Sequence, residues 1–247
     1  MTRAVVIIAA HAFEARAAAS VGQGVSREPW GRWMLYRGEL WDAPMAVIRC
    51  GPGKVAAAAA AQAAIQYLEP AMLISFGTAG CPDTRVEAGT LTIARSVVDV
   101  ALRELGELPV HIPHRFDPDR RLTDCLLDVP GTTAADLFCW EGHVASPVNR
   151  PPLDEDTQGP AVVDWESAAV AHVAEMWSAP WAALKVVSDH GEPERLRLLA
   201  MAARRPLQWG AEAVRRASRH FLEPIGDRDE EVDRHGSEVG QEIGEDD

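Results

Sequence analysis

The stretch Val162-Val163-Asp164-Trp165-Glu166-Ser167-Ala168 is followed about twenty residues later by Val186-Val187-Ser188-Asp189, and together they decide the fold. Each is a short β-branched apolar run that ends in acidic residues, the pattern of a buried parallel strand. Ligands of open α/β sheets bind at the carboxyl ends of such strands. We therefore expect Glu166 and Asp189 to face one cleft. A further acid, Glu14, follows the first apolar run, and carboxylates at strand ends suit acid–base chemistry on a polar small molecule.

Alternating strands and helices extend from these two stretches along the chain. Strands are predicted at residues 4–10, 31–39, 44–50, 71–76, 89–97, 137–145, 161–163 and 181–187. Helices are predicted at residues 13–19, 54–67, 122–127, 167–177 and 193–221, the last with a break or a new start at Pro206. This order predicts an α/β fold, a single-domain three-layer αβα arrangement with a mixed, mostly parallel central sheet and helices on both faces.

The charge of the chain is concentrated at its C-terminus. The net charge is −13, and residues 227–247 hold ten acidic residues against Arg228 and Arg234. We expect one domain at residues 1–225 and an acidic, disordered tail at residues 226–247. Because no basic stripe occurs, the composition argues against nucleic acid as a partner.

The four cysteines, Cys50, Cys81, Cys125 and Cys139, have no CxxC spacing and are predicted to be reduced and buried. No cluster has the spacing of zinc ligands, so no metal and no organic cofactor is expected. The first apolar run is cut short by polar residues, which favours a strand over a signal peptide. The Ala-rich segment 55–65 is too short to span a bilayer. These features predict a cytoplasmic protein with no membrane partner.

Each candidate motif has a structural alternative. Gly77-Thr78-Ala79-Gly80 allows backbone N–H groups to approach a ligand closely, or it forms a tight turn after a strand. Glu166 suits a ribose diol, or it is an acid favoured at a helix N-terminus. Asp189 is a site acid, or an ordinary cap or turn residue. The coincidence of these two acids with Glu14 favours a site. His11 and His190 flank two of the acids and are more simply interpreted as structural.

Taken together, these pieces resemble the nucleoside phosphorylase/nucleosidase superfamily, in particular its methylthioadenosine/S-adenosylhomocysteine nucleosidase branch. The resemblance runs from Ala4 to about Phe221 and leaves the tail outside. Its anchors are Ile7-Ile8-Ala9-Ala10 leading to Glu14, Gly51-Pro52-Gly53-Lys54-Val55-Ala56, Gly77-Thr78-Ala79-Gly80, Val163-Asp164-Trp165-Glu166-Ser167-Ala168 and Ser188-Asp189. It implies cleavage of the N-glycosidic bond between a purine and a ribose by a homodimer.

The resemblance also implies a role for each acid. Asp189 would be the general acid that donates a proton to N7 of the base. Glu166 would hold the ribose hydroxyls and stabilise positive charge on the sugar. Glu14 would position or deprotonate the attacking water. The substrate-binding residues implied beside these are Thr78, Ala79, Gly80, Asp164, Trp165, Ser188, Lys185 and Val148. Among them, Ser188 would orient Asp189, and Lys185 stands where an arginine orients Glu14 in the nucleosidases.

Two details bear on the reaction and the substrate. The related phosphorylases carry a phosphate-binding arginine just before the glycine loop, where this chain has Ser75-Phe76, and they lack an acid equivalent to Glu14. Both differences favour a hydrolase. A phosphorylase, in which Arg16 binds the anion, and a non-catalytic nucleoside-binding protein are the alternatives. An aspartate at position 189 favours adenine over hypoxanthine as the base.

The sequence departs from the methylthioadenosine enzymes around the base. The segment 146–160 is shorter than theirs and has no aromatic residue, so base packing would use Val148 or Phe138. The Asp-Trp-Glu-Ser order at 164–167 replaces Glu-Met-Glu-Ala. It is closer to the Asp-Met-Glu-Ser of relatives proposed to act on adenosylhopane, and futalosine-type substrates are also compatible. The group on the 5′ carbon of the ribose stays open.

Overall fold

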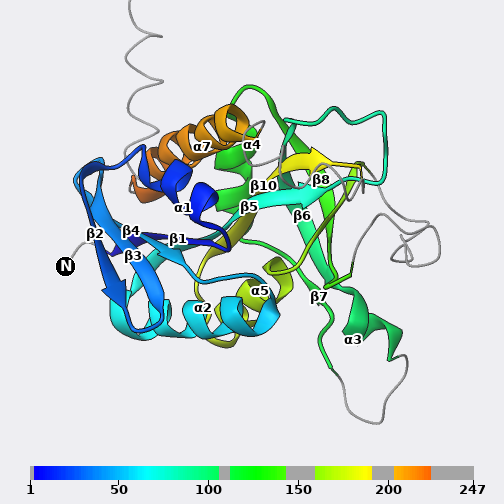
Figure 1. Cartoon of the computed structure of the whole chain (residues 1–247), viewed down its shortest axis with the longest axis horizontal. Coiled ribbons are helices and arrows are strands. Elements are labelled where there is room, and N and C mark those ends of the chain that lie inside the picture. The colour runs from blue at the N-terminus through cyan, green and yellow to red at the C-terminus, as the bar shows by residue number, and fades with distance from the viewer. Residues whose placement is uncertain (1–2, 106–111, 143–158, 191–202, 224–247) are drawn as a thin grey trace, which may run out of the picture.

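A computed structural model describes residues 3–105, 112–142, 159–190 and 203–223 of the chain. Within them, one mixed β-sheet lies between two groups of helices (Figure 1). The strands are β1 (Ala4–Ala9), β2 (Gln23–Trp30), β3 (Trp33–Leu40), β4 (Ala43–Arg49), β5 (Pro70–Gly80), β6 (Leu91–Asp99), β7 (Arg115–Phe116), β8 (Thr132–Cys139), β9 (Ala161–Asp164) and β10 (Trp181–Asp189). The helices are α1 (Ala12–Ala19), α2 (Lys54–Leu68), α3 (Val100–Glu104), α4 (Arg120–Leu127), α5 (Ser167–Met176) and α7 (Arg204–Leu222).

Part of the sheet closes on itself. Parallel pairings join β4 to β1, β1 to β5 and β5 to β10, and also β6 to β8 and β8 to β9. Antiparallel pairings of β10 with β6 and of β5 with β9 complete a ring of five strands. The hairpin strands β3 and β2 extend the sheet beyond β4, and β7 pairs with β6. The predicted mixed sheet is confirmed, and its closure brings the carboxyl ends of β5, β9 and β10 together.

Helices cover both faces of the sheet, as the alternation of elements predicts. Figure 1 shows α1, α4 and α7 on one face and α2 and α5 on the other. Neighbouring residues of β1 point to opposite faces: Ile7 belongs to the apolar core beneath α1 and α7, and Ile8 to the core beneath α2 and α5. Both side chains are buried. A strand buried on both faces explains why β1 is continuously apolar in sequence.

Local sequence explains where two helices begin and end. The alanine-rich α2 starts after Gly53, whose φ of 95° suits glycine, and it ends at Glu69 before Pro70 opens β5. Pro206 lies in the first turn of α7, where a proline is tolerated because its missing N–H has no intrahelical partner. A new helix start near Pro206 is therefore confirmed. Residues 193–202 of the predicted helix lie outside the described residues.

Several sequence predictions are corrected by the structure. Strand β2 was not predicted, since its residues are almost all exposed and lack alternation. The strand predicted at 137–145 was placed too far toward the C-terminus, because the observed strand β8 begins at Thr132 and ends at Cys139. The segment Gly77-Thr78-Ala79-Gly80 is not a turn; it stays extended as the last part of β5 and pairs with β10. The short elements α3 and β7 were also missed. The predicted tail at 226–247 lies outside the described residues.

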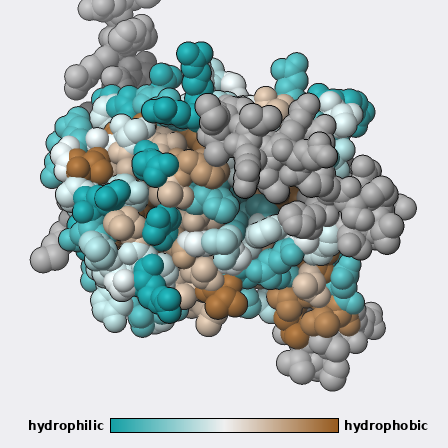
Figure 2. Space-filling view, in the orientation of Figure 1, coloured by the Kyte–Doolittle hydropathy of each residue, from teal (hydrophilic) through white to brown (hydrophobic). Residues whose placement is uncertain are grey.

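The surface view shows a largely hydrophilic face with apolar surface gathered around the projecting α3 (Figure 2). Leu105, directly after α3, is 53% exposed. None of the helices in the described residues is both long enough and apolar enough to cross a membrane.

Candidate active site

The last four residues of β5 connect the three predicted acids. The backbone and side chain of Thr78 bind Glu14, and Gly80 pairs with Asp189 of β10. Gly80 also pairs with Val163 of β9, three residues before Glu166. Because a strand rises about 3.3 Å per residue, the contacts at Thr78 and Gly80 are about 7 Å apart. The extended Gly77–Gly80 segment thus contacts Glu14 and pairs with the strands that lead to Glu166 and Asp189, and Glu14 and Glu166 line one small cavity.

Glu14 is held by the backbone of two elements. Its Oε2 accepts a hydrogen bond from the N–H of His11 at 2.8 Å, and its Oε1 accepts from the N–H and the hydroxyl of Thr78, both at 2.9 Å. The residue is 2% exposed. A Cβ at Gly77 would lie 2.8 Å from Oε1 of Glu14, so only glycine leaves room for the carboxylate. Glu14 is fixed in orientation by these contacts, and it is a buried acceptor for a further donor.

Glu166 is the N-cap residue of α5 and reaches the start of α2. Its Oε1 accepts a hydrogen bond from the N–H of Gly53 at 2.8 Å. Burial is the main cause that raises the pKa of Glu166 to about 7, followed by the neighbouring charge of Asp164, while Lys185 acts in the opposite direction. The carboxylate therefore titrates near neutral pH. Perturbed acids of this kind concentrate at functional sites.

Lys185 and Asp164 form a buried ion pair beneath the two glutamates. Nζ of Lys185 lies 2.8 Å from Oδ2 of Asp164 and 3.1 Å from Oγ of Ser75. Burial alone would lower the pKa of Lys185, but the charges of Asp164 and Glu166 more than offset it and raise that pKa. Two expectations are corrected here. Asp164, which was expected to bind substrate, is only 3% exposed and binds Lys185. Lys185, which was expected to orient Glu14, binds Asp164 instead.

A small cavity lies between these groups. It is lined by Ile8, Ala10, Glu14, Ser75, Phe76, Gly77, Thr78, Glu166 and Lys185. The space open to the centre of a water-sized sphere is about 10 Å³, which is close to the minimum that holds one water molecule. Its polar lining offers the donors and acceptors that a bound water requires. The geometry therefore fits one water between Glu14, Glu166 and Lys185.

Asp189 ends β10 on the other side of Gly80. The hydroxyl of Ser188 donates to Oδ2 of Asp189 at 2.6 Å and lies 3.1 Å from the carbonyl oxygen of Ala79. This is the contact expected of a residue that orients Asp189. Nδ1 of the next residue, His190, is 2.9 Å from the carbonyl oxygen of Cys81, which fits a structural histidine.

Three further residues were predicted to contact the sugar or the base: Trp165, Phe138 and Val148. Nε1 of the half-buried Trp165, the residue before Glu166 in sequence, donates to the carbonyl of Gly142 at 3.2 Å. Phe138 is 1% exposed and belongs to an apolar cluster, so its ring is not available to stack on a base. Val148 lies outside the described residues. Sequence reasoning missed the N–H of Gly53 and the hydroxyl of Ser75, although the glycine loop before α2 offered a signal for the first.

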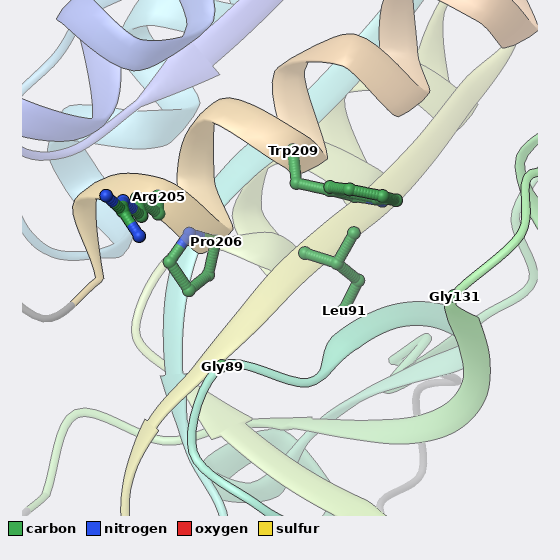
Figure 3. Close-up of a pocket in the computed structure, with 6 residues that line it drawn as sticks. All are labelled: Gly89, Leu91, Gly131, Arg205, Pro206 and Trp209. Carbon is green, nitrogen blue, oxygen red and sulfur yellow. The ribbon is translucent and has the colours of Figure 1, made fainter.

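The cysteines and the remaining polar side chains of the described residues lie apart from this cavity or are buried. Within them, no three His, Cys, Asp or Glu side chains are grouped so that they could hold a metal ion. Burial raises the pKa of the Cys50 thiol to about 12 and that of Cys139 well above its ordinary value, so neither is a thiolate at neutral pH. A separate open pocket of about 340 Å³ lies between the start of α7 and the starts of β6 and β8, with Trp209 and Leu91 facing each other (Figure 3). It contains none of the acids.

A partly closed mixed sheet with helices on both faces defines an α/β protein, in which Glu14, Glu166 and Lys185 line a small cavity beside β5. The chain belongs to the Phosphorylase superfamily, whose family model matches residues 4–223. A 5′-methylthioadenosine/S-adenosylhomocysteine nucleosidase from Desulfotalea psychrophila is 29% identical over 172 residues, covering 64% of this chain and 72% of that protein. The nucleosidase of the same name from Actinobacillus succinogenes is 25% identical over 199 residues, covering 76% and 86%.

Solved structures show the same fold. The futalosine hydrolase of Helicobacter pylori superposes with a TM-score of 0.77 at 17% identity, covering 89% of this chain and 99% of that chain. The methylthioadenosine/S-adenosylhomocysteine nucleosidase from Neisseria meningitidis, in complex with methylthio-immucillin-A, gives a TM-score of 0.71 at 21% identity, with coverage of 89% and 98%. The predicted superfamily and fold class are confirmed.

Proposed function

We propose that this protein is a purine nucleoside N-glycosidase that hydrolyses the bond between an adenine-type base and a 5′-modified ribose. The observation that carries the proposal is the buried, firmly held carboxylate of Glu14 beside a cavity the size of one water. Relatives named as nucleosidases and as a futalosine hydrolase support the same reaction.

In the first step the bond between C1′ and the base nitrogen breaks, and its electron pair goes to the base. Asp189 gives its proton to N7, so the base leaves neutral, and Ser188 keeps the carboxyl group in place. The sugar develops positive charge, which the carboxylate of Glu166 stabilises electrostatically. The N–H of Gly53 fixes one oxygen of Glu166 before the reaction begins, so little reorganisation is needed.

In the second step the water attacks C1′ and loses a proton to Glu14. The carboxylate is oriented by Thr78 and His11 and needs no movement to accept that proton. The products are the free base and the free sugar, and Asp189 and Glu14 return to their starting protonation states through solvent.

The phosphorylase alternative is less well supported by the geometry. Ser75 and Phe76, where the phosphorylases carry an arginine, are buried at 1% exposure each, and Arg16 is exposed on α1. The small cavity beside Glu14 matches a single water. The third alternative is a nucleoside-binding protein without catalysis. Binding alone would not require a carboxylate held by three hydrogen bonds, as that of Glu14 is.

A panel of nucleosides separates these functions. Methylthioadenosine, S-adenosylhomocysteine, futalosine, adenosine and inosine are incubated with the protein, with and without phosphate, and released base and sugar are quantified. The expected result is base release in phosphate-free buffer with free sugar as the co-product, fastest with an adenine nucleoside. Strict dependence on phosphate, with a sugar phosphate as product, would instead establish the phosphorylase. Tight binding by calorimetry without turnover would establish the binding protein.

The rate is expected to fall on the acid side of neutral pH. Glu166, whose pKa burial raises to about 7, stabilises the sugar cation only when it is ionised. Below that pH the protonated form gains population, and the rate should fall about tenfold for each further pH unit. Initial rates of base release between about pH 5 and pH 9 check this. A rate that stays constant down to about pH 5 contradicts the role given to Glu166.

We further propose a cytoplasmic homodimer, with the tail at 226–247 outside the catalytic domain at 1–225. Large apolar side chains on α2 and at the end of α5 support self-association, because exposed apolar patches mark interaction sites. Their exposed fractions are 85% for Val55, 72% for Tyr67, 71% for Met176 and 50% for Trp177. Light scattering checks the oligomeric state, and the mass of one chain at micromolar concentration rules out a stable dimer.

A further inference from the structure

A closed ring of hydrogen bonds joins four buried polar side chains beneath the site. Nζ of Lys185 contacts Oδ2 of Asp164 at 2.8 Å and Oγ of Ser75 at 3.1 Å. The hydroxyls of Ser75 and Ser167 are 2.9 Å apart, and Oγ of Ser167 is 2.6 Å from the same Oδ2 of Asp164. None of the four residues is more than 3% exposed. Water therefore does not compete for these bonds.

The chemistry of the four groups fixes the direction of every proton in the ring. An ammonium group can only donate and an ionised carboxylate can only accept, so Ser167 donates to Asp164. With its proton used, Ser167 accepts from Ser75, and Ser75 in turn accepts from Lys185. Two of the three N–H donors of Lys185 are thereby committed. A network satisfied in this way holds its members in one arrangement.

Lys185 has competing acceptors close by. It lines the same small cavity as Glu14 and Glu166, and its charge favours the ionised form of Glu166. The other groups that face Glu166 are Asp164 from β9, the thiol of Cys50 after β4 and the N–H of Gly53 before α2. The cation nevertheless binds Asp164, which lies below the cavity, and not the carboxylates that face it.

We propose that Ser75 and Ser167 are positioning residues that keep the Lys185 ammonium on Asp164 and away from Glu14 and Glu166. Ser75 accepts a hydrogen bond from one N–H of the ammonium. Ser167 donates to the Asp164 oxygen that binds the same ammonium. Glu166 thus stays free of a direct salt bridge, and its charge remains available to the sugar. This catalytic consequence rests on the proposed function, whereas the placement of the cation does not.

The test replaces each hydroxyl and measures the titration of Glu166. In Ser75→Ala the freed N–H of Lys185 turns to the carboxylates that line the cavity, and the titration midpoint of Glu166 is expected to fall by about one pH unit. Ser167→Ala should give a smaller shift in the same direction. The midpoint is read by carbon NMR of glutamate-labelled protein, with the Glu166 signal assigned by its loss in Glu166→Gln. The acid limb of the rate profile should move with it, and kcat should fall about tenfold.

Thr92→Val is the matched control. The hydroxyl of Thr92 is also buried, at 1% exposure, and it donates to the backbone carbonyl of Lys185 at 2.9 Å without touching the ammonium. This variant should lose thermal stability but keep the midpoint of Glu166. If Ser75→Ala also keeps that midpoint, the hydroxyls are merely structural and the proposal is wrong. A wild-type protein without any turnover would overturn the proposed function alone, because the NMR midpoint still reports where the cation lies.

Discussion

Asp189→Asn is expected to lower kcat for base release by about 10²–10⁴-fold. Asparagine keeps the shape of aspartate, and its amide oxygen can still accept the hydrogen bond that Ser188 makes to Oδ2 at 2.6 Å. It has no acidic proton to give to N7, so the base would have to leave as an anion. Because geometry and hydrogen bonding are conserved, the loss isolates proton donation. Initial rates measure kcat, and calorimetry measures nucleoside affinity.

Asp83→Asn is the control for this change. Asp83 lies in the loop after β5 and binds Arg85 on the surface, with Oδ2 2.8 Å from Nη2 of Arg85. The same chemical substitution there should change kcat by no more than about twofold, as is usual for surface positions. If Asp189→Asn keeps more than about a tenth of the activity, the general acid is a different group. If nucleoside affinity falls as steeply as kcat, Asp189 serves binding and not proton transfer.

The strands that carry the site could be predicted because they are buried on both faces. β1 is a continuous apolar run and β5 and β10 are mostly apolar, and their positions were predicted to within a few residues. β2 could not be found in the same way. It pairs only with β3, is exposed along almost its whole length and includes Pro29, so neither alternation nor a buried run marks it. The closure of the ring depends on pairings between distant segments, which local patterns do not encode.

The three acids were singled out for a related reason: each follows an apolar run, and the ends of parallel strands meet at one edge. Their partners could not. The N–H of Gly53 that binds Glu166 comes from a residue 113 positions away, and it is a backbone group present in every non-proline residue. Ser75 is a single hydroxyl within an apolar strand. The resemblance implied that the residue at position 185 orients Glu14, and this prediction was wrong. Nζ of Lys185 instead lies 2.8 Å from Oδ2 of Asp164.

The contrast between Glu166 and Glu141 leads to the second large effect. Both carboxylates accept hydrogen bonds from the start of α2: Oε1 of Glu166 from the N–H of Gly53, and Oε1 of Glu141 from the N–H of Lys54, each at 2.8 Å. As helix caps the two are equivalent. They differ in surroundings, since Glu166 lines the cavity and titrates near neutral pH, whereas Glu141 is exposed.

Glu166→Gln is therefore expected to lower kcat by about 10²–10³-fold, while Glu141→Gln changes it by only about twofold. In both variants the amide oxygen can still accept from the helix, so the cap is kept and only the charge is lost. The charge matters at Glu166 because positive charge develops on the sugar beside it, in a site where little water screens the interaction. Single-turnover rates measure the difference. Equal, small losses in the two variants would show that Glu166 is only a helix cap, and the stabilisation of the sugar cation would then have to come from Glu14.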